Sequence, residues 1–228
     1  MKEDIVRLLL EVPQNEKNQE ERLGKLKEEF IRLLQETQRE GMDKVLVALE
    51  KKGFFTAPAS AGKHLNHKGG LLEHSMIVCC LALKIRDQLA GLDSELEEKV
   101  KTENVVIAAL LHDFCKAITY KETEKWRKDA NNRWESYMGY VADYSSLPIG
   151  HGEKSVVMLL LTGLKLKSSE IMAIRWHMGA WDLNFQSYEM KESIGAANSN
   201  FPLVTILQSA DSMATHILEK RFETKDTK

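Results

Sequence analysis

The sequence predicts a mostly α-helical protein with one large domain and an appendage. Apolar residues recur at helical spacing along most of its 228 residues, and only residues 120–146 depart from that pattern. The chain is 43% apolar and 29% charged, which is typical of globular proteins rather than of disordered or fibrous ones. A chain of this length can bury a substantial hydrophobic core.

The first 54 residues predict an N-terminal helical extension. Helices are expected over residues 2–12 and 18–40, and Gly41 interrupts the pattern before helix resumes through Lys52. In the second of them Leu23 and Phe30, and likewise Leu26 and Leu33, lie seven residues apart. These pairs leave a homo-oligomer through a short coiled coil open, although the abundance of Lys and Glu is typical of a solvated face.

The main domain is expected over residues 55–222, followed by a tail over 223–228. It opens on a loop over residues 53–69, which is rich in Gly and Pro. Helices are then expected at about 70–90, 94–115, 151–162, 168–178 and 201–222. Aromatic residues flank Asn131-Asn132 in the remaining segment, which predicts a small β-hairpin inserted over 120–146.

Charge and cysteine content exclude several classes of protein. The net charge of −2 argues against an extended nucleic-acid surface, which is usually basic, but leaves room for a local nucleotide pocket. The three cysteines, an odd number, suggest no disulfide framework, so a reducing cytoplasm is expected. No secretory signal or membrane partner is expected, because the chain opens on an amphipathic segment and its longest apolar run, 76–83, is short.

The doublet His112-Asp113 is the strongest chemical signal in the sequence. It ends the apolar stretch 105–111, where two polar side chains are costly unless they are paired or bind metal. Adjacent helical positions point about 100° apart, so the imidazole could reach one ion while the carboxylate bridges two. The alternative is structural: His112 caps its own helix, and Asp113 forms a salt bridge.

Four further residues stand alone in apolar helices or at helix ends, and they are His74, His151, His177 and Asp211. Each of them, taken singly, is more often a structural residue with a satisfied hydrogen bond. Together with the doublet they form a set of four imidazoles and two carboxylates on different helices. Such a set predicts convergence in one interior.

The order of these residues resembles the signature of the HD superfamily, which is named after its His-Asp doublet. His74, the doublet and Asp211 follow that signature, and the intervening His151 and His177 resemble its two-metal branch. That branch includes cyclic-nucleotide phosphodiesterases, HD-GYP domains and myo-inositol oxygenase. The strings at residues 64–75 and 111–116 also resemble uncharacterised HD hydrolases of bacteria and phages, and a phage protein would act in the host cytoplasm.

The resemblance covers residues 55–222 and implies an all-α HD-domain helical bundle with two divalent transition metals. His74, His112 and Asp211 would hold one ion, His151 and His177 would hold the other, and Asp113 would bridge them. Mixed imidazole and carboxylate ligands suit Mn, Fe, Co, Ni or Zn better than Mg or Ca.

Four residues are candidates for binding a substrate phosphate. Lys116 shares a helix face with the doublet, if that helix continues, and it could neutralise the phosphate; the alternative is a surface lysine. Lys154, three residues after His151, could do the same or lie at the surface. His64 and His67 could line the mouth of the site from the loop before the His74 helix, or could be structural.

The function implied by the resemblance is that of a metal-dependent phosphohydrolase or phosphodiesterase. It would act on a nucleotide or another small-molecule phosphate ester through a dinuclear, metal-activated hydroxide, with Asp113 and Lys116 as catalytic residues. Two other classes remain open. One is a di-iron oxygenase of the myo-inositol oxygenase type, and the other is a non-catalytic, metal-stabilised binding or regulatory module.

Overall fold

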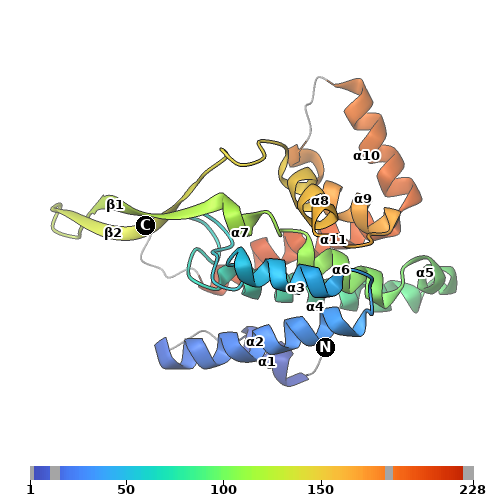
Figure 1. The fold of residues 1–228 in the computed structure, drawn as a ribbon, viewed down its shortest axis with the longest axis horizontal. Coiled ribbons are helices and arrows are strands. Elements are labelled where there is room, and N and C mark those ends of the chain that lie inside the picture. The colour runs from blue at the N-terminus through green and yellow to red at the C-terminus, as the bar shows by residue number, and fades with distance from the viewer. Residues whose placement is uncertain (1–2, 11–15, 183–186, 223–228) are drawn as a thin grey trace.

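Helices dominate the computed structural model, which describes residues 3–10, 16–182 and 187–222 (Figure 1). Within these ranges the only sheet is a two-stranded hairpin, which confirms the all-α fold class with a small inserted hairpin. No helix in the described ranges is both long and apolar enough to cross a membrane. The predicted tail over 223–228 lies outside the described residues.

Three helices form the N-terminal part: α1 (Glu3–Leu10), α2 (Glu16–Glu36) and α3 (Met42–Lys51). The apolar stripe of α2 faces the interior, where Leu26 and Phe30 are fully buried and Leu33 is nearly so. These side chains belong to the same hydrophobic core as the rest of the chain. The residues at heptad spacing are therefore largely used inside the molecule.

The main bundle is built around α4 (Gly70–Ala90), whose first turns are buried on every side. The other helices of the bundle are, in chain order, α5 (Ser94–Lys99), α6 (Thr102–Leu111), α7 (Lys116–Thr119), α8 (His151–Leu161), α9 (Ser168–Trp176), α10 (Tyr188–Asn200) and α11 (Pro202–Met213). Helix α4 packs against α6 and α11, and α9 packs against α6, α8 and α11. A continuous core therefore surrounds the ends of α6, α8 and α9.

The structure corrects the predicted helix over 94–115, which is two helices. The break falls at Val100 and Lys101, whose backbones lie outside the helical region, and α6 ends at Leu111 before the doublet. The predicted helix over 201–222 is likewise not uniform. Helix α11 ends at Met213 and continues as a π turn (η2, Ala214–Leu218) and a 3₁₀ turn (η3, Glu219–Phe222).

Helix α10 was not expected, because its sequence has little apolar periodicity. Only one residue along it, Ala197, is buried. The helix begins with a side-chain cap, in which the hydroxyl of Ser187 accepts the backbone N–H of Met190. Local capping and the packing of Ala197 and a few partly buried apolar side chains thus support this helix, and neither gives a strong periodic signal.

The predicted hairpin over 120–146 is confirmed. Strands β1 (Tyr120–Lys128) and β2 (Trp134–Ala142) pair antiparallel, from Tyr120 opposite Ala142 to Lys128 opposite Trp134. The carboxylate of Asp129 closes the turn by accepting the backbone N–H groups of Asn131 and Arg133. The hairpin leaves α7 and projects beyond the helical bundle (Figure 1).

Two buried ion pairs join the N-terminal part to the main bundle. Arg22 of α2 lies 2.7 Å from Glu73, the residue before His74 on α4. Arg39, just beyond α2, makes two contacts of 2.7 and 2.8 Å with the buried carboxylate of Glu170 on α9. The predicted division into 1–54 and 55–222 stays a prediction, but the two parts are linked by ion pairs as well as by a shared core.

Candidate metal centre

The six residues expected to bind metal lie together inside the bundle, although they come from five helices. Helix α4 supplies one imidazole from its buried first turns. The others sit at the ends of α6 and α9, at the first residue of α8, and on α11. Overlapping groups of three with their ligand atoms within 4.8 Å of one another include all six: His74, His112, Asp113, His151, His177 and Asp211.

Close packing of α8 against the end of α9 brings two of the imidazoles together. Gly152 follows His151, and a Cβ atom at this position would lie 2.3 Å from the carbonyl oxygen of Arg175. Only glycine allows the two backbones to approach so closely. The rings of His151 and His177 therefore meet with their centroids 5.2 Å apart.

The carboxylate of Asp113 lies at the centre of the cluster and faces a different pair of imidazoles with each oxygen. Its Oδ2 is 3.3 Å from Nε2 of His74 and 3.3 Å from Nε2 of His112. Its Oδ1 is 3.6 Å from Nε2 of His177 and also contacts Nε2 of His151. A carboxylate so placed could share its two oxygens between two ions.

All four imidazoles turn Nε2 toward the cluster and use Nδ1 elsewhere. Nδ1 of His112 lies 2.8 Å from the carbonyl oxygen of Ala109, and Nδ1 of His177 lies 2.7 Å from that of Ile174. Because a carbonyl oxygen only accepts, each of these Nδ1 atoms carries the hydrogen and leaves a lone pair on Nε2. His112 thus caps its own helix through Nδ1, as the structural alternative predicted. In the same position the ring leaves Nε2 free to bind metal.

The spacing of the donor atoms fits ligands that share an ion. Nε2 of His74 lies 3.2 Å from Nε2 of His112 and 3.3 Å from Oδ1 of Asp211. Two atoms each about 2.1 Å from one ion, at angles of roughly 90–109°, are about 3.0–3.4 Å apart.

Opposite charges are already paired in the cluster. Burial opposes a charge on His74, but Glu219, Asp113 and Asp211 outweigh burial and raise the pKa of His74 well above its ordinary value. Burial also opposes a charge on His151, but Asp113 raises the pKa of His151 to about 10. Both imidazoles therefore hold a second proton near neutral pH when no metal ion is bound.

The pKa values of the two carboxylates and of His177 are lowered. Burial disfavours the charge of Asp113, yet Lys116 and His112 hold the pKa of Asp113 well below its usual range. The pKa of Asp211 is lowered despite burial, chiefly by His74. Burial and the neighbouring His112 lower the pKa of His177 to about 3, so this ring is neutral. In the ion-free centre Asp113 and Asp211 are therefore charged, His74 and His151 are protonated, and His177 is neutral.

Lys116 reaches the cluster from the first turn of α7. Its ammonium lies 2.7 Å from Oδ2 of Asp113, and its side chain is mostly buried. Burial opposes its charge, but Asp113 outweighs that cost and raises the pKa of Lys116. A charged ammonium thus stands beside the candidate ligands without being able to donate a lone pair to an ion.

The other candidates for substrate binding are placed differently. The ammonium of Lys154 is buried and donates to the carbonyl oxygen of Ser146 at 2.6 Å, in the connection before α8. His67 lies outside the cluster, with Nδ1 3.1 Å from the carbonyl oxygen of Lys68. His64 lies beside His74, with ring centroids 5.4 Å apart. The structure therefore places His64 at the edge of the centre, whereas Lys154 and His67 contact backbone carbonyl oxygens.

Glu219 belongs to the centre and was not expected from the sequence. Its carboxylate is fully buried, and Oε1 lies 2.7 Å from Nδ1 of His74. In the sequence it stands in Leu218-Glu219-Lys220, which is indistinguishable from a surface segment at the end of a helix. The available signal was an acidic residue two turns beyond Asp211, which is too weak to select it.

Fold and site together define a helical protein with a buried His/Asp cluster that could hold metal ions. The model of the HD domain family matches residues 71–215, which is more than half of the chain, so the chain belongs to the HD domain family. A segment of 68 residues is 37% identical to the dihydroneopterin 2′,3′-cyclic phosphate phosphodiesterase of Methanocaldococcus jannaschii. That similarity covers 30% of this chain and only 26% of the archaeal protein. No solved structure matches the chain.

Proposed function

We propose that this chain is a phosphohydrolase or phosphodiesterase that acts on a nucleotide or another phosphate ester at a centre of two divalent transition metals. The observation that carries the proposal is the position of Asp113, whose two oxygens face two different pairs of imidazoles. Two such ions would clamp a phosphate group and lower the pKa of a bridging water. The donor set suits Mn, Fe, Co, Ni or Zn.

The residues of the chain have distinct tasks in this proposal. His74, His112 and Asp211 hold one ion, and His151 and His177 hold the other, while Asp113 joins them. The hydrogen bonds of the Nδ1 atoms fix the ring orientations before substrate arrives, so little reorganisation is needed during the reaction. Lys116, beside Oδ2 of Asp113, is the nearby cation that can neutralise a non-bridging phosphate oxygen.

The name of the archaeal relative favours a cyclic phosphodiester as substrate. That protein is described as acting on a 2′,3′-cyclic phosphate. The experiment is therefore a panel of phosphomonoesters, linear phosphodiesters, and 2′,3′- and 3′,5′-cyclic nucleotides, with Mn²⁺, Co²⁺ or Ni²⁺. We expect hydrolysis of at least one phosphodiester that stops when a chelator is added.

Two experimental results would assign the protein to a different functional class. Oxygen uptake with a polyol by the iron-loaded protein, without cleavage of any phosphate ester, would indicate the oxygenase class. Tight metal binding with neither activity would indicate a regulatory or binding module whose ions are structural. Either result, obtained with folded and metal-loaded protein, would contradict the hydrolase assignment.

Replacing Lys116 with alanine separates substrate binding from metal binding. An ammonium cannot be a ligand, so the variant should keep the metal content of the wild type. It should lose one charge-assisted contact with the phosphate, worth about 1.5–3 kcal/mol. That corresponds to a decrease in kcat/KM of roughly ten- to a hundredfold. Initial rates and elemental analysis on the same sample measure both quantities.

Two controls make the Lys116 test specific. Lys121→Ala removes an exposed lysine of β1 that pairs with Asp143, and it should leave both quantities unchanged. Lys116→Arg should restore part of the activity, because its charge is kept but the guanidinium is wider and planar. Unchanged kinetics in Lys116→Ala would remove this residue from the site, and a loss of metal would assign it a structural role.

A further inference from the structure

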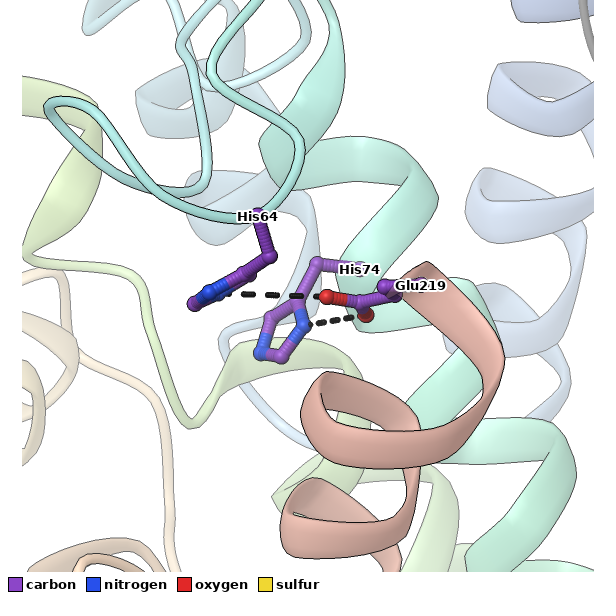
Figure 2. Close-up of side chains that lie close together, drawn as sticks. All are labelled: His64, His74 and Glu219. Carbon is purple, nitrogen blue, oxygen red and sulfur yellow. Dashed lines mark hydrogen bonds and ion pairs between the residues drawn. The ribbon is translucent and has the colours of Figure 1, made fainter. Parts of the chain in front are cut away.

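Two further side chains, the buried Glu219 and the partly buried His64, lie close to the ring of His74. Figure 2 shows His64, from the loop before α4, and Glu219, from η3, beside the ring of His74, with the carboxylate of Glu219 facing Nδ1. Donor atoms of the three residues lie within 4.8 Å of one another. Neither Glu219 nor His64 has a role in the hydrolysis proposed above.

One oxygen of Glu219 fixes the ring of His74. Oε1 accepts a hydrogen bond from Nδ1–H of His74 at 2.7 Å, and both side chains are buried (Figure 2). A carboxylate that binds Nδ1–H keeps the hydrogen on that nitrogen and leaves Nε2 to face the cluster. The negative charge also makes Nε2 a stronger electron-pair donor, because it stabilises positive charge that spreads through the ring.

The other oxygen of Glu219 faces His64. Oε2 of Glu219 and Nε2 of His64 are buried, and neither has a hydrogen-bond partner among the described residues. They lie 3.9 Å apart, so a small movement of either side chain would form a hydrogen bond between them. Two unsatisfied buried groups are costly separately, and their proximity indicates that His64 serves to hold the carboxylate.

The loop that carries His64 is itself tightly fixed. The hydroxyl of Ser60 donates to the carbonyl oxygen of His64 at 2.8 Å, and Leu65 adopts a left-handed backbone with φ of 44°. Gly70 makes this possible, because a Cβ atom there would lie 2.0 Å from the carbonyl oxygen of Leu65. A strained residue persists only where its surroundings determine it, so the position of His64 is well defined.

Among the residues that the structure describes, none gives the other three imidazoles such a charged partner at Nδ1. His112 and His177 donate to backbone carbonyl oxygens, and Nδ1 of His151 contacts the sulfur of Cys115 at 3.4 Å. His151 is also partly exposed, whereas His74 is almost fully buried. The two halves of the centre are therefore unequal, and the stronger imidazole donor lies in the half that contains His74.

We propose that Glu219 and His64 are positioning residues that make the ion held by His74 and His112 the more tightly bound of the two. This inference rests on the proposed two-metal centre. It assigns no catalytic step to either residue, since both act through the ring of His74. Glu219 supplies orientation and charge, and His64 holds the second carboxylate oxygen.

The experiment is a calorimetric titration of the ion-free, full-length chain with Zn²⁺ in the presence of a competing chelator. We expect two binding steps in the wild type. Glu219→Gln keeps the shape of the side chain but removes its charge, and it should weaken the tighter step roughly 10- to 100-fold. The weaker step and the total of two ions should be unchanged. Glu98→Gln, at an exposed position of α5, is the matched control and should change neither step.

A second measurement reads the hydrogen on His74 directly and does not depend on activity. In the Zn²⁺-loaded wild type, ¹H–¹⁵N NMR of the imidazoles should show an Nδ1–H of His74 shifted downfield by its carboxylate partner. Glu219→Gln should move that resonance upfield. His64→Ala keeps Glu219 and should weaken the tighter binding step by a smaller factor. This variant replaces Glu219→Gln in the titration if Glu219→Gln does not fold.

The possible failures are distinguishable. Absence of any binding by the folded wild type would overturn the metal centre and this inference together. Two steps in the wild type, with the tighter one unchanged in Glu219→Gln and in His64→Ala, would overturn only the inference. Loss of a whole equivalent in His64→Ala would mean that His64, His74 and Glu219 ligate an ion themselves, which also contradicts a positioning role.

Discussion

Replacing Asp113 with asparagine is expected to abolish phosphodiester hydrolysis and to remove at least one of the two ions. Each oxygen of this carboxylate faces a different pair of imidazoles, so its loss removes a ligand from both halves of the proposed centre. Loss of a single preorganised electrostatic group costs about a hundred- to a thousandfold in kcat, and loss of a bridging ligand should cost at least that much. Hydrolysis rates with the best substrate of the panel measure the loss of activity, and elemental analysis measures the loss of metal.

The Asp113→Asn variant must be shown to fold. In the ion-free protein the carboxylate pairs with Lys116 and His151, and removing one partner of a buried ion pair costs about 3–5 kcal/mol. Circular dichroism and a melting curve would reveal any loss of structure. Asp43→Asn, at an exposed position in the first turn of α3, is the matched control and should resemble the wild type. A folded Asp113→Asn variant with two bound ions and normal rates would refute the bridging role.

The affinity for metal should rise steeply between pH 6 and pH 8. The pKa of His74 is raised well above its ordinary value and that of His151 is raised to about 10, so both rings hold a proton that an ion must displace. Each displaced proton increases the binding constant by up to about tenfold per pH unit while the pH stays below the raised pKa. Displacement of two protons would thus approach a hundredfold per unit for the two ions together.

The same pKa shifts predict that the folding stability of the ion-free protein changes with pH in the opposite direction to its metal affinity. A pKa that folding raises stabilises the folded state below the unfolded value, about 6.5 for histidine, and this contribution is lost as the pH rises through the folded value. The ion-free chain should therefore lose stability from pH 7 to pH 9, whereas the metal-loaded chain should not.

Calorimetric titration at pH 6, 7 and 8, in buffers with different ionisation enthalpies, measures both the affinity and the number of protons released. His151→Gln should reduce the release by about one proton, because one of the two protonated rings is removed. The mutation of an exposed imidazole, His216→Gln, should leave the number unchanged. A binding constant independent of pH over this range would contradict the charge pairing described for the centre.

The sequence predicted the helical bundle and the meeting of the six residues because both depend on strong local patterns. His112 and Asp113 stand out since they follow the apolar stretch 105–111, and such residues are expensive to bury without a purpose. The hairpin was predictable from the aromatic residues on either side of Asn131-Asn132. These patterns can be recognised in the sequence without any knowledge of the fold.

The details that the sequence did not predict depend on contacts between distant segments. Lys154 has the expected spacing from His151, yet its ammonium is used by the carbonyl oxygen of Ser146. Glu219 looks like a surface residue until the last helical turns carry it to His74. The break before α6 at Lys101 also has no proline or glycine to announce it. In each case the decisive interaction is one of tertiary structure.

The number of metal ions bound per chain is the most direct test of the proposed two-metal centre. The purified wild-type protein should be supplemented with Mn²⁺, Co²⁺ or Zn²⁺, freed of excess ion, and measured by elemental analysis against protein concentration. We expect two equivalents per chain in the wild type and a clear decrease in Asp113→Asn. A folded wild-type protein that holds at most a trace of any of these metals would contradict the assignment of the His/Asp cluster as a two-metal centre.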